Sequence, residues 1–357
     1  MPAPEVVPLS GRRIAITGVT GQVAAPIARA LAVDNEVIGL ARFSDAAARA
    51  SLEAAGVDCR VVDLTRGGPE ASGVAAVPAD VDHVLHFAVT KIGRWAKDLT
   101  ANGEAVGDLM SHFRGARSFL HCSSTAVYRP TGGAPMAETD PFGDHHGAVM
   151  PTYSIAKIAG ETMAQFGARH WELPTTIARL NVPYGDDDGW PVFHLEMLLA
   201  GASIDVHSDG GRYNPIHHDD IIALIPALLA VAAVPATVVN LAGPEVASIE
   251  EWSAELGRLA GGGHRATDAR PCHRRTDRAR SARSVDTVSC RCRRSPPGWC
   301  RCCKTSASSI CPPGRSCPRM DRCDRRSGRR LDPPGSLCRS SRPHRWRSFR
   351  RLRQRRI

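Results

Sequence analysis

The chain lacks the features that mark membrane-spanning and secreted proteins. Its 357 residues contain no stretch of about 18 uncharged apolar residues, so no transmembrane helix is expected. The opening residues, MPAPEVVPLSGRR, contain no basic segment followed by an apolar one, so no secretory signal is expected either. The length is sufficient for one large domain or two ordinary ones. We therefore expect a globular protein of the cytoplasm.

Lysine and tyrosine are scarce, with four of each in the whole chain. Nevertheless Tyr153 and Lys157 lie four positions apart in the helix-like segment PTYSIAKIAG. A helix turns once per about 3.6 residues, so the two side chains would share one face. A phenol beside an ammonium is a candidate proton-transfer pair if the rest of the chain supplies a cofactor and a substrate site.

Charge and cysteine are distributed unevenly, and the net charge of +10 averages two unlike pieces. Residues 1–263 carry 18 Lys and Arg against 30 Asp and Glu, whereas residues 264–357 carry 28 against 6. Ten of the twelve cysteines also fall in the second piece. Only Cys59 and Cys122 precede it, in apolar strand-like surroundings that suit buried free thiols.

The segment 264–357 has almost no apolar periodicity, so nothing in it predicts a packed core. Three interpretations remain open. Cys300 and Cys303 form a single CxxC without a matching second pair, which argues against a zinc module. A disordered basic arm could bind nucleic acid. We favour a shifted reading frame, because GC-rich codons read out of frame yield this mixture of Arg, Pro, Ser, Gly and Cys.

Apolar strand-like segments alternate with helical ones over the first 124 residues, which predicts a parallel sheet with crossover helices. Ligands of such sheets bind at the carboxyl ends of the strands. The polar and glycine-rich candidates all follow a predicted strand directly; they are Gly18 and Gly21, Arg42, Asp63, Phe87–Val89 and Ser123–Ser124. We expect an α/β fold with a Rossmann-type doubly wound parallel sheet.

The segment RRIAITGVTGQVAAPIARAL, residues 12–31, combines a short strand, a glycine turn and an alanine-rich helix. Such a turn lets backbone N–H groups and the helix N-terminus contact a pyrophosphate. The third small position of the turn is Ala24. This arrangement predicts a dinucleotide site.

The residue at the end of the second predicted strand helps to distinguish NAD from NADP, which carries an additional 2′-phosphate. A ribose with free hydroxyls is usually held by an acidic residue there, but the strand ends in Arg42. Arg42 could pair with a 2′-phosphate, which favours NADP; the alternative is a solvated arginine. Asp63 could accept a hydrogen bond from the adenine amine, or it could cap the following turn.

The glycine turn, SSTAVY and YSIAK occur in an order that resembles the extended short-chain dehydrogenase/reductases, the NAD(P)-dependent epimerase/dehydratase family. Further matches are VVDL, HFAV, NVPYG and IHHDDI, and together they span residues 12 to about 250. The resemblance implies an oxidoreductase or epimerase that acts on a hydroxyl or carbonyl substrate of sugar-derived type, with NADP or NAD as cofactor. It implies the catalytic residues Ser124, Tyr153 and Lys157. It implies the cofactor-binding residues Gly18, Thr20, Gly21, Gln22, Val23, Arg42, Asp63, Leu64, Phe87, Ala88, Val89, Tyr153, Lys157, Asn181, Val182 and Pro183.

In the role that the resemblance implies, Tyr153 is the acid/base and Lys157 its electrostatic partner, which also reaches the nicotinamide ribose. A free phenol has a pKa near 10, so it is too weakly acidic to serve as a base at neutral pH. A nearby ammonium and the nicotinamide cation are expected to lower the pKa of Tyr153 by about 2–4. Ser124 would hydrogen-bond the substrate oxygen, with Thr125 as the alternative.

The chain departs from the family pattern in three places. RLNVPYG differs from RxxNVYG, so Asn181, Val182 and Pro183 could each be shifted by one position. Arg212 lies one residue further from the following histidine than the arginine that grips the diphosphate in sugar-nucleotide enzymes, which weakens a nucleotide-sugar assignment. The substrate domain normally continues well past residue 263, where this chain changes character.

These departures lead to an expected division into a dinucleotide-binding domain (1–180), a small, incomplete substrate lobe interleaved with the last sheet elements (181–263) and the basic tail (264–357). Ser124, Thr125 and Arg212 are the expected substrate contacts. We expect no metal site, because Asp186–Asp188 suits a solvated loop and His207, His217 and His218 lack zinc spacing.

Two other functions stay open. One is a non-catalytic NADP-binding regulator, which retention of Ser124, Tyr153 and Lys157 disfavours. The other is nucleic-acid binding, if the basic tail is genuine. A small-molecule substrate and a homodimer are the expected partners, with no membrane.

Overall fold

The computed structural model describes residues 9–144, 147, 150–185, 188–206, 211–260 and 270–271. Contacts within the chain divide it into two units, Met1–Val285 and Asp286–Ile357. The second unit lies wholly outside the described residues. The expectations for the tail, residues 264–357, therefore fall outside them too, apart from Arg270–Pro271.

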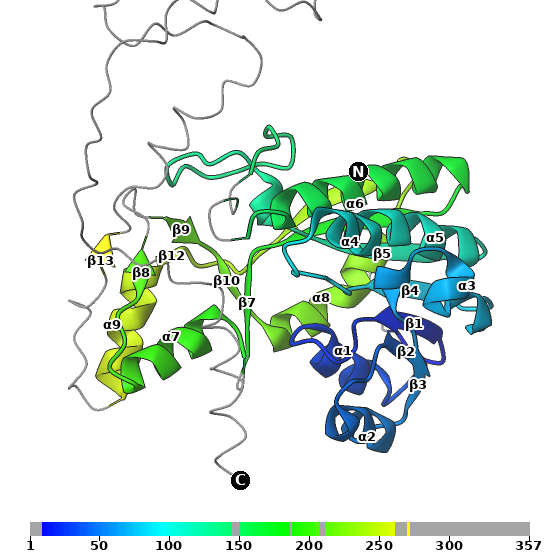
Figure 1. Cartoon of the computed structure of the whole chain (residues 1–357), viewed down its shortest axis with the longest axis horizontal. Coiled ribbons are helices and arrows are strands. Elements are labelled where there is room, and N and C mark those ends of the chain that lie inside the picture. The colour runs from blue at the N-terminus through cyan, green and yellow to red at the C-terminus, as the bar shows by residue number, and fades with distance from the viewer. Residues whose placement is uncertain are drawn as a thin grey trace, which may run out of the picture. The chain divides into compact units, whose positions relative to one another are not determined.

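A seven-stranded sheet with the order β11-β6-β5-β4-β1-β2-β3 forms the centre of the first unit (Figure 1). Every neighbouring pair of its strands is parallel. Its strands are β1 (Arg13–Thr17), β2 (Glu36–Ala41), β3 (Val57–Val61), β4 (His83–His86), β5 (Ser118–Ser124), β6 (Thr175–Leu180) and β11 (Thr237–Leu241). The strand order reverses between β1 and β4, where ligands of such sheets bind. The predicted doubly wound fold is confirmed.

Helices cover both faces of this sheet. They are α1 (Ala24–Leu31), α2 (Ala46–Ala54), α3 (Pro69–Ser72), α4 (Trp95–Leu99), α5 (Ala105–His112), α6 (Tyr153–His170) and α8 (His218–Ala230). Buried residues of α1, α2 and α8 pack in one apolar cluster, and those of α5 and α6 in another. Figure 1 accordingly draws α5 and α6 on the side of the sheet opposite to α1 and α8.

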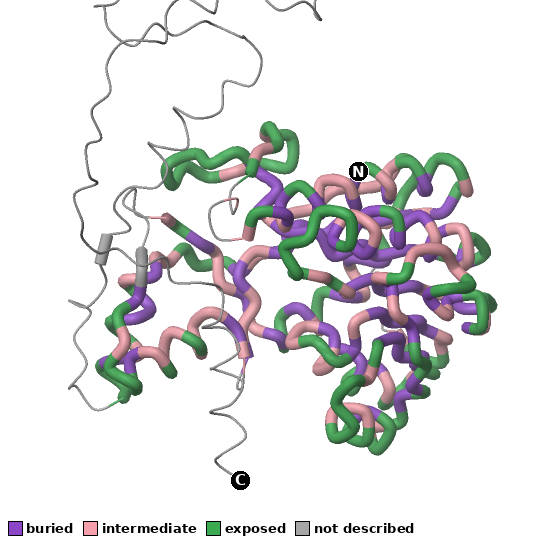
Figure 2. The backbone as a smooth tube through the Cα atoms, viewed as in Figure 1, coloured by how far each residue is buried: buried purple, intermediate pink, exposed green. Residues whose placement is uncertain are grey.

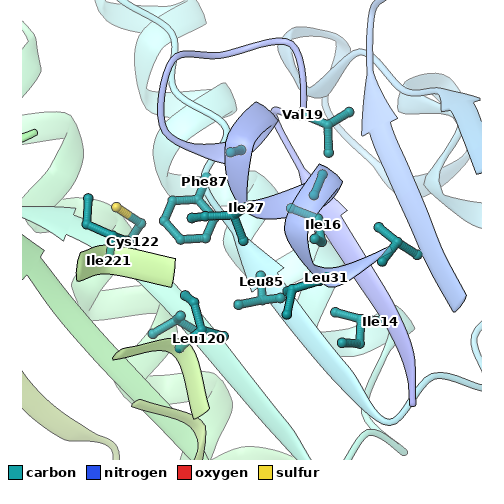
Figure 3. Close-up of a cluster of buried hydrophobic side chains, with 14 of the residues drawn as sticks. Ile14, Ile16, Val19, Ile27, Leu31, Leu85, Phe87, Leu120, Cys122 and Ile221 are labelled. Carbon is teal, nitrogen blue, oxygen red and sulfur yellow. The ribbon is translucent and has the colours of Figure 1, made fainter. Parts of the chain in front are cut away.

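Alternation along the strands sends neighbouring side chains into the two clusters. Ile14 and Ile16 of β1 join the cluster of α1, as Figure 3 shows, whereas Ala15 between them joins the cluster of α5 and α6. Successive side chains of a strand point to opposite faces, so a strand covered on both sides is apolar throughout. The tube in Figure 2 is accordingly buried along most of the central strands.

The helical segment between β4 and β5 is interrupted. Between α4 and α5 a π-helical turn spans Thr100–Glu104. Asn102 in this turn accepts a hydrogen bond from Thr90 N (2.8 Å) and donates to Thr90 O (2.9 Å). The turn therefore anchors the loop that follows β4.

After Leu180 the chain alternates between the sheet and a smaller lobe. The remaining elements are β7 (Val182–Tyr184), α7 (Trp190–Leu199), β8 (Asp205–Val206), β9 (Arg212–Tyr213), β10 (Pro215–His217), β12 (Ala247–Ser248), α9 (Ile249–Leu259) and β13 (Arg270–Pro271). The helices α7 and α9 contribute to a third cluster that includes Leu198, Tyr213 and Trp252. A capping box of Ser248 and Glu251 starts α9, the helix that the segment SIEEWSAELGRL predicts.

Candidate active site

The glycine turn between β1 and α1 lies against the loop that follows β4. Gly18 has φ = +74°, and a Cβ atom added there would lie 2.8 Å from both the Cα and the backbone N of Ala88. Ala88 N in turn donates to Thr17 Oγ1 at the end of β1 (3.1 Å). Only glycine fits this close backbone approach. The turn is thus held at the point where the strand order reverses, as the sequence predicts.

A cleft with a volume of about 140 Å³ opens from this turn. It brings together residues that follow four different strands. The residues predicted for the site that line it are Gly18, Gly21, Gln22, Val23, Phe87, Val89, Ser124, Tyr153, Lys157, Asn181 and Pro183. The predicted residues that do not line it are Thr20, Arg42, Asp63, Leu64, Ala88, Thr125, Val182 and Arg212.

One face of α6 carries the tyrosine and the lysine to the end of β5. Lys157 is buried, and its Nζ donates to the carbonyl oxygen of Cys122 (2.8 Å). Ser124 ends β5 and accepts a hydrogen bond on Oγ from Ala126 N (3.2 Å). Ser124 also hydrogen-bonds Tyr153. The structure therefore assembles all three predicted catalytic residues in one wall of the cleft.

The protein by itself shifts the pKa of Tyr153 upward, whereas the expected lowering also counts the charge of the nicotinamide cation and stays a prediction. Burial raises the pKa of Tyr153 to about 12, and the hydrogen bond from Ser124 only partly opposes this. The ammonium of Lys157 donates to the Cys122 carbonyl oxygen. Burial also lowers the pKa of Lys157, with a smaller contribution from Lys91. At neutral pH the phenol is therefore neutral unless a further positive charge enters the cleft.

The residues predicted to hold the adenosine lie at the ends of β2 and β3. Arg42 is exposed, and across the described ranges its side chain has no hydrogen bond or ion pair. Asp63 caps the short turn Leu64–Arg66 by accepting from Thr65 N (3.1 Å) and Thr65 Oγ1 (2.7 Å). The turn cap that the sequence offered for Asp63 is thus present, and the hydrogen bond to an adenine amine stays a prediction. Leu64 itself is buried beneath this turn.

Arg212 does not lie in the wall of the cleft. It is exposed on β9, and its NH1 lies 3.6 Å from Glu251 Oε2 on α9. Its partner strand β12 holds it on the lobe. Arg212, which lies one residue further than usual from the following histidine, thus pairs with the carboxylate of Glu251 in the lobe. The expectation that Arg212 lines the substrate site is not supported by this placement.

The NVPYG segment divides between the cleft and the packing beneath it. Asn181 and Pro183 line the cleft, whereas Val182 is buried in β7 and pairs with Pro215 of β10. Asn181 Oδ1 accepts from Asn214 N (3.1 Å), so its side chain also ties the cleft to the lobe.

Three residues line the cleft that the sequence did not assign to it, namely Lys91, Cys122 and Leu180. Lys91 is the most informative, because its Nζ lies 5.1 Å from the centroid of the Tyr153 ring. Desolvation of the ammonium by the surrounding protein lowers the pKa of Lys91. A signal was available: Lys91 is one of only three lysines before residue 264, and it follows HFAV in the loop after β4.

The loop that carries Lys91 is held at both ends by buried polar groups. Asp98 accepts hydrogen bonds from Ile92 N (3.1 Å) and Gly93 N (2.8 Å). Its Oδ2 also accepts from Thr152 Oγ1 (2.6 Å), directly before Tyr153. Asp98 therefore connects the Lys91 loop to the start of α6, which fixes Lys91 over Tyr153.

Within the described part of the chain, no group of three or more His, Cys, Asp or Glu side chains is arranged to hold a metal ion. His217 caps α8 through Nδ1, which accepts from Asp219 N (3.2 Å). Asp186, Asp187 and His207 lie outside the described residues. No helix among the described residues is long and apolar enough to cross a membrane.

A glycine turn at the reversal point of a parallel sheet, opening on a polar cleft, defines a Rossmann-type protein that binds a nucleotide cofactor. The sequence model of the NAD dependent epimerase/dehydratase family matches residues 14–242. The chain belongs to this family, which confirms the resemblance drawn from its motifs. Members of the family are enzymes that use NAD, so the expected nicotinamide dinucleotide is confirmed as the class of cofactor. A search of the curated proteins finds no match.

Solved structures of the same fold include several sugar-nucleotide enzymes. UDP-glucuronic acid 4-epimerase from Bacillus cereus, in complex with UDP-glucuronic acid and NAD, is 21% identical with a TM-score of 0.59, covering 71% of this chain and 84% of its own. UDP-N-acetylglucosamine 4-epimerase from Methanobrevibacter ruminantium M1 is 17% identical with a TM-score of 0.59, covering 72% and 84%. dTDP-glucose 4,6-dehydratase from Streptomyces venezuelae, with NAD bound, is 21% identical with a TM-score of 0.59, covering 74% and 85%. At these identities the likeness is one of fold.

Proposed function

We propose that the chain catalyses an NAD(P)-dependent oxidation–reduction or epimerisation at a hydroxyl-bearing carbon of a sugar-derived substrate, with Ser124, Tyr153 and Lys157 as its proton-transfer site. One observation carries the proposal: a single face of α6 sets Tyr153 beside Ser124 in the same cleft that begins at the Gly18 turn. The sugar-nucleotide ligands named for proteins of the same fold support the sugar-derived class.

The residues at the cleft fit a nicotinamide dinucleotide. Gly18 and Gly21 carry no side chain, so the pyrophosphate would meet backbone N–H groups of the turn and the start of α1. Lys157 and Lys91 supply positive charge further along the cleft. When bound, the cofactor accepts or supplies the hydride, and the protein supplies binding, orientation and proton transfer.

Ser124 and Tyr153 would meet the substrate oxygen together. Ser124 donates a hydrogen bond to that oxygen, and the Tyr153 hydroxyl exchanges a proton with it as hydride leaves or reaches the carbon. In the protein alone the pKa of Tyr153 is about 12, so the phenol is poised as an acid. Action as a base requires additional positive charge near the ring, which oxidised nicotinamide carries.

The proposal is tested by incubating the full-length protein with NAD⁺ or NADP⁺ and a panel of UDP-, dTDP- and GDP-sugars and free sugars. Products are followed by proton NMR, and reduced cofactor is followed by absorbance at 340 nm. We expect epimerised or oxidised product from at least one sugar-derived compound. Tight cofactor binding without turnover of any panel member would favour the non-catalytic regulator instead.

Arg42 is expected to set a preference for NADP. Its guanidinium is exposed at the end of β2, where a 2′-phosphate can reach it, and a charge-assisted hydrogen bond contributes about 1.5–3 kcal/mol. Replacing Arg42 with alanine should therefore weaken NADPH binding by about 10-fold or more and leave NADH binding within about twofold. Isothermal titration calorimetry with both cofactors measures the two affinities.

Arg60→Ala is the matched control, because Arg60 is exposed on the next strand but its guanidinium is paired with Asp58 (2.8 Å). This variant should bind both cofactors as the wild type does. Equal or tighter binding of NADH by the wild type, unchanged in Arg42→Ala, would show that Arg42 is a solvated arginine.

A further inference from the structure

Three successive turns of α6 contact the last three residues of β5. Tyr153 hydrogen-bonds Ser124, and Lys157 Nζ donates to the Cys122 carbonyl (2.8 Å). One turn further, Glu161 Oε1 accepts a hydrogen bond from Ser123 Oγ (2.5 Å). Tyr153, Lys157 and Glu161 are spaced four residues apart, so they form one stripe of the helix. The third contact lies behind the candidate active site and has no part in the proposed chemistry.

Glu161 is a buried carboxylate with a buried arginine as its partner. Glu161 and Arg179 are each 3% exposed. Arg179 Nε lies 3.0 Å from Oε1, and its NH2 lies 2.8 Å from Oε2, which makes the pair bidentate. Arg179 of β6 is the cross-strand partner of Ser123 in the sheet register. One carboxylate therefore joins β5, β6 and α6.

Arg179 also holds the segment that follows Ser124. Its guanidinium carbon lies 4.8 Å from the centroid of the Tyr128 ring and 5.0 Å from that of Phe142. Its NH1 donates to the Glu138 carbonyl oxygen (2.8 Å). A planar fork with five donors satisfies these directions together, whereas an ammonium does not. The side chain is thus matched to arginine.

Breaking a buried ion pair leaves an uncompensated charge, so separating Glu161 from Arg179 would be strongly unfavourable. We propose that Glu161 and Arg179 are positioning residues that fix the end of β5 against α6 and so set the hydrogen bond between Ser124 and Tyr153. This inference rests on the proposed function, because it assigns the pair to the orientation of the same proton-transfer site.

The experiment measures the pKa of Tyr153 in the NAD⁺-saturated full-length protein by tyrosinate absorbance at 295 nm. The chain has only four tyrosines, so subtracting the titration of Tyr153→Phe isolates Tyr153. Glu161→Gln and Ser123→Ala should each raise this pKa by about 1 pH unit, because the hydrogen bond from Ser124 favours the phenolate. The other titratable groups near Tyr153 are Lys91, Cys122 and Lys157. Ser123→Ala changes no charge near them, whereas Glu161→Gln also removes a carboxylate that raises the pKa of Lys157.

Arg179→Lys should restore part of what Arg179→Met loses, because lysine keeps the charge beside Glu161. The matched control is Glu255→Gln, which breaks the exposed pair of Glu255 and Arg258 on α9 (2.6 Å). It should leave the Tyr153 pKa unchanged. NAD⁺ affinity should stay within about threefold in Glu161→Gln, since neither the glycine turn nor any residue in the wall of the cleft is changed.

The outcomes separate the two hypotheses. If Tyr153 titrates below pH 11 in the wild type but keeps the same pKa in Glu161→Gln and Ser123→Ala, the positioning role is wrong and the proposed function stands. If wild-type Tyr153 shows no ionisation below pH 11 with NAD⁺ bound, both are wrong. Should Glu161→Gln fail to fold, Ser123→Ala decides alone, because it leaves the buried ion pair intact.

Discussion

Replacing Tyr153 with phenylalanine is expected to lower turnover of the true substrate by about 10²–10⁴-fold, the usual contribution of a positioned acid or base. The change deletes only the hydroxyl, and the ring keeps its place at the start of α6 beneath Lys91. Affinity for the nicotinamide cofactor should therefore stay within a few-fold. Steady-state kinetics and calorimetry measure the two effects separately.

Tyr213→Phe is the matched control, because it removes the same atom from the core of the lobe, outside the wall of the cleft. It should leave turnover close to that of the wild type. Lys157→Ala should behave differently and reduce both turnover and cofactor affinity, since it deletes a buried ammonium from the same cleft. Wild-type rates in Tyr153→Phe would show that another group transfers the proton.

Replacing Gly18 with alanine is expected to weaken NAD(H) and NADP(H) binding by at least about 10-fold, equivalent to roughly 1.4 kcal/mol. The added Cβ would lie 2.8 Å from the backbone of Ala88, and neither backbone can yield without moving the end of β1 or the loop after β4. The positive φ of +74° adds strain that only glycine avoids. Calorimetric titration of the purified variant measures the loss.

Gly11→Ala separates the contact from the strain. Gly11 also has a positive φ, +63°, but no atom lies within 4 Å of the position that its Cβ would take. This control should lose some thermal stability and bind the cofactor normally. Undiminished binding by Gly18→Ala would mean that the dinucleotide does not lie on this turn.

Short-range patterns in the sequence were sufficient to predict the fold. Apolar strands that alternate with helical segments can bury both faces only as a parallel sheet with helices on either side, which is what β1 to β6 form. The spacing of Tyr153 and Lys157 placed both on one helical face for the same kind of reason, because local periodicity determines which side chains share a face.

The sequence could not predict which candidates would reach the cleft. Arg42 and Arg212 both looked suited to phosphate, yet neither lines it, and Arg212 pairs with Glu251 from a helix that begins 37 residues later. Lys91 was overlooked, because nothing local shows that a loop residue 62 positions before Tyr153 lies over its ring. Such contacts join elements far apart in the chain.

The sequence by itself determined the class of fold and the glycine turn, since each depends on spacing within one or two elements. The three candidate catalytic residues came from the resemblance of its motifs to those of the family. Only the tertiary structure decided the electrostatics of the site. The pKa of Tyr153 moves up to about 12, because burial by neighbouring elements outweighs the hydrogen bond from Ser124. The ion pair of Glu161 and Arg179 likewise exists only where α6 crosses β5 and β6, because desolvation and long-range pairing arise when separate elements pack together.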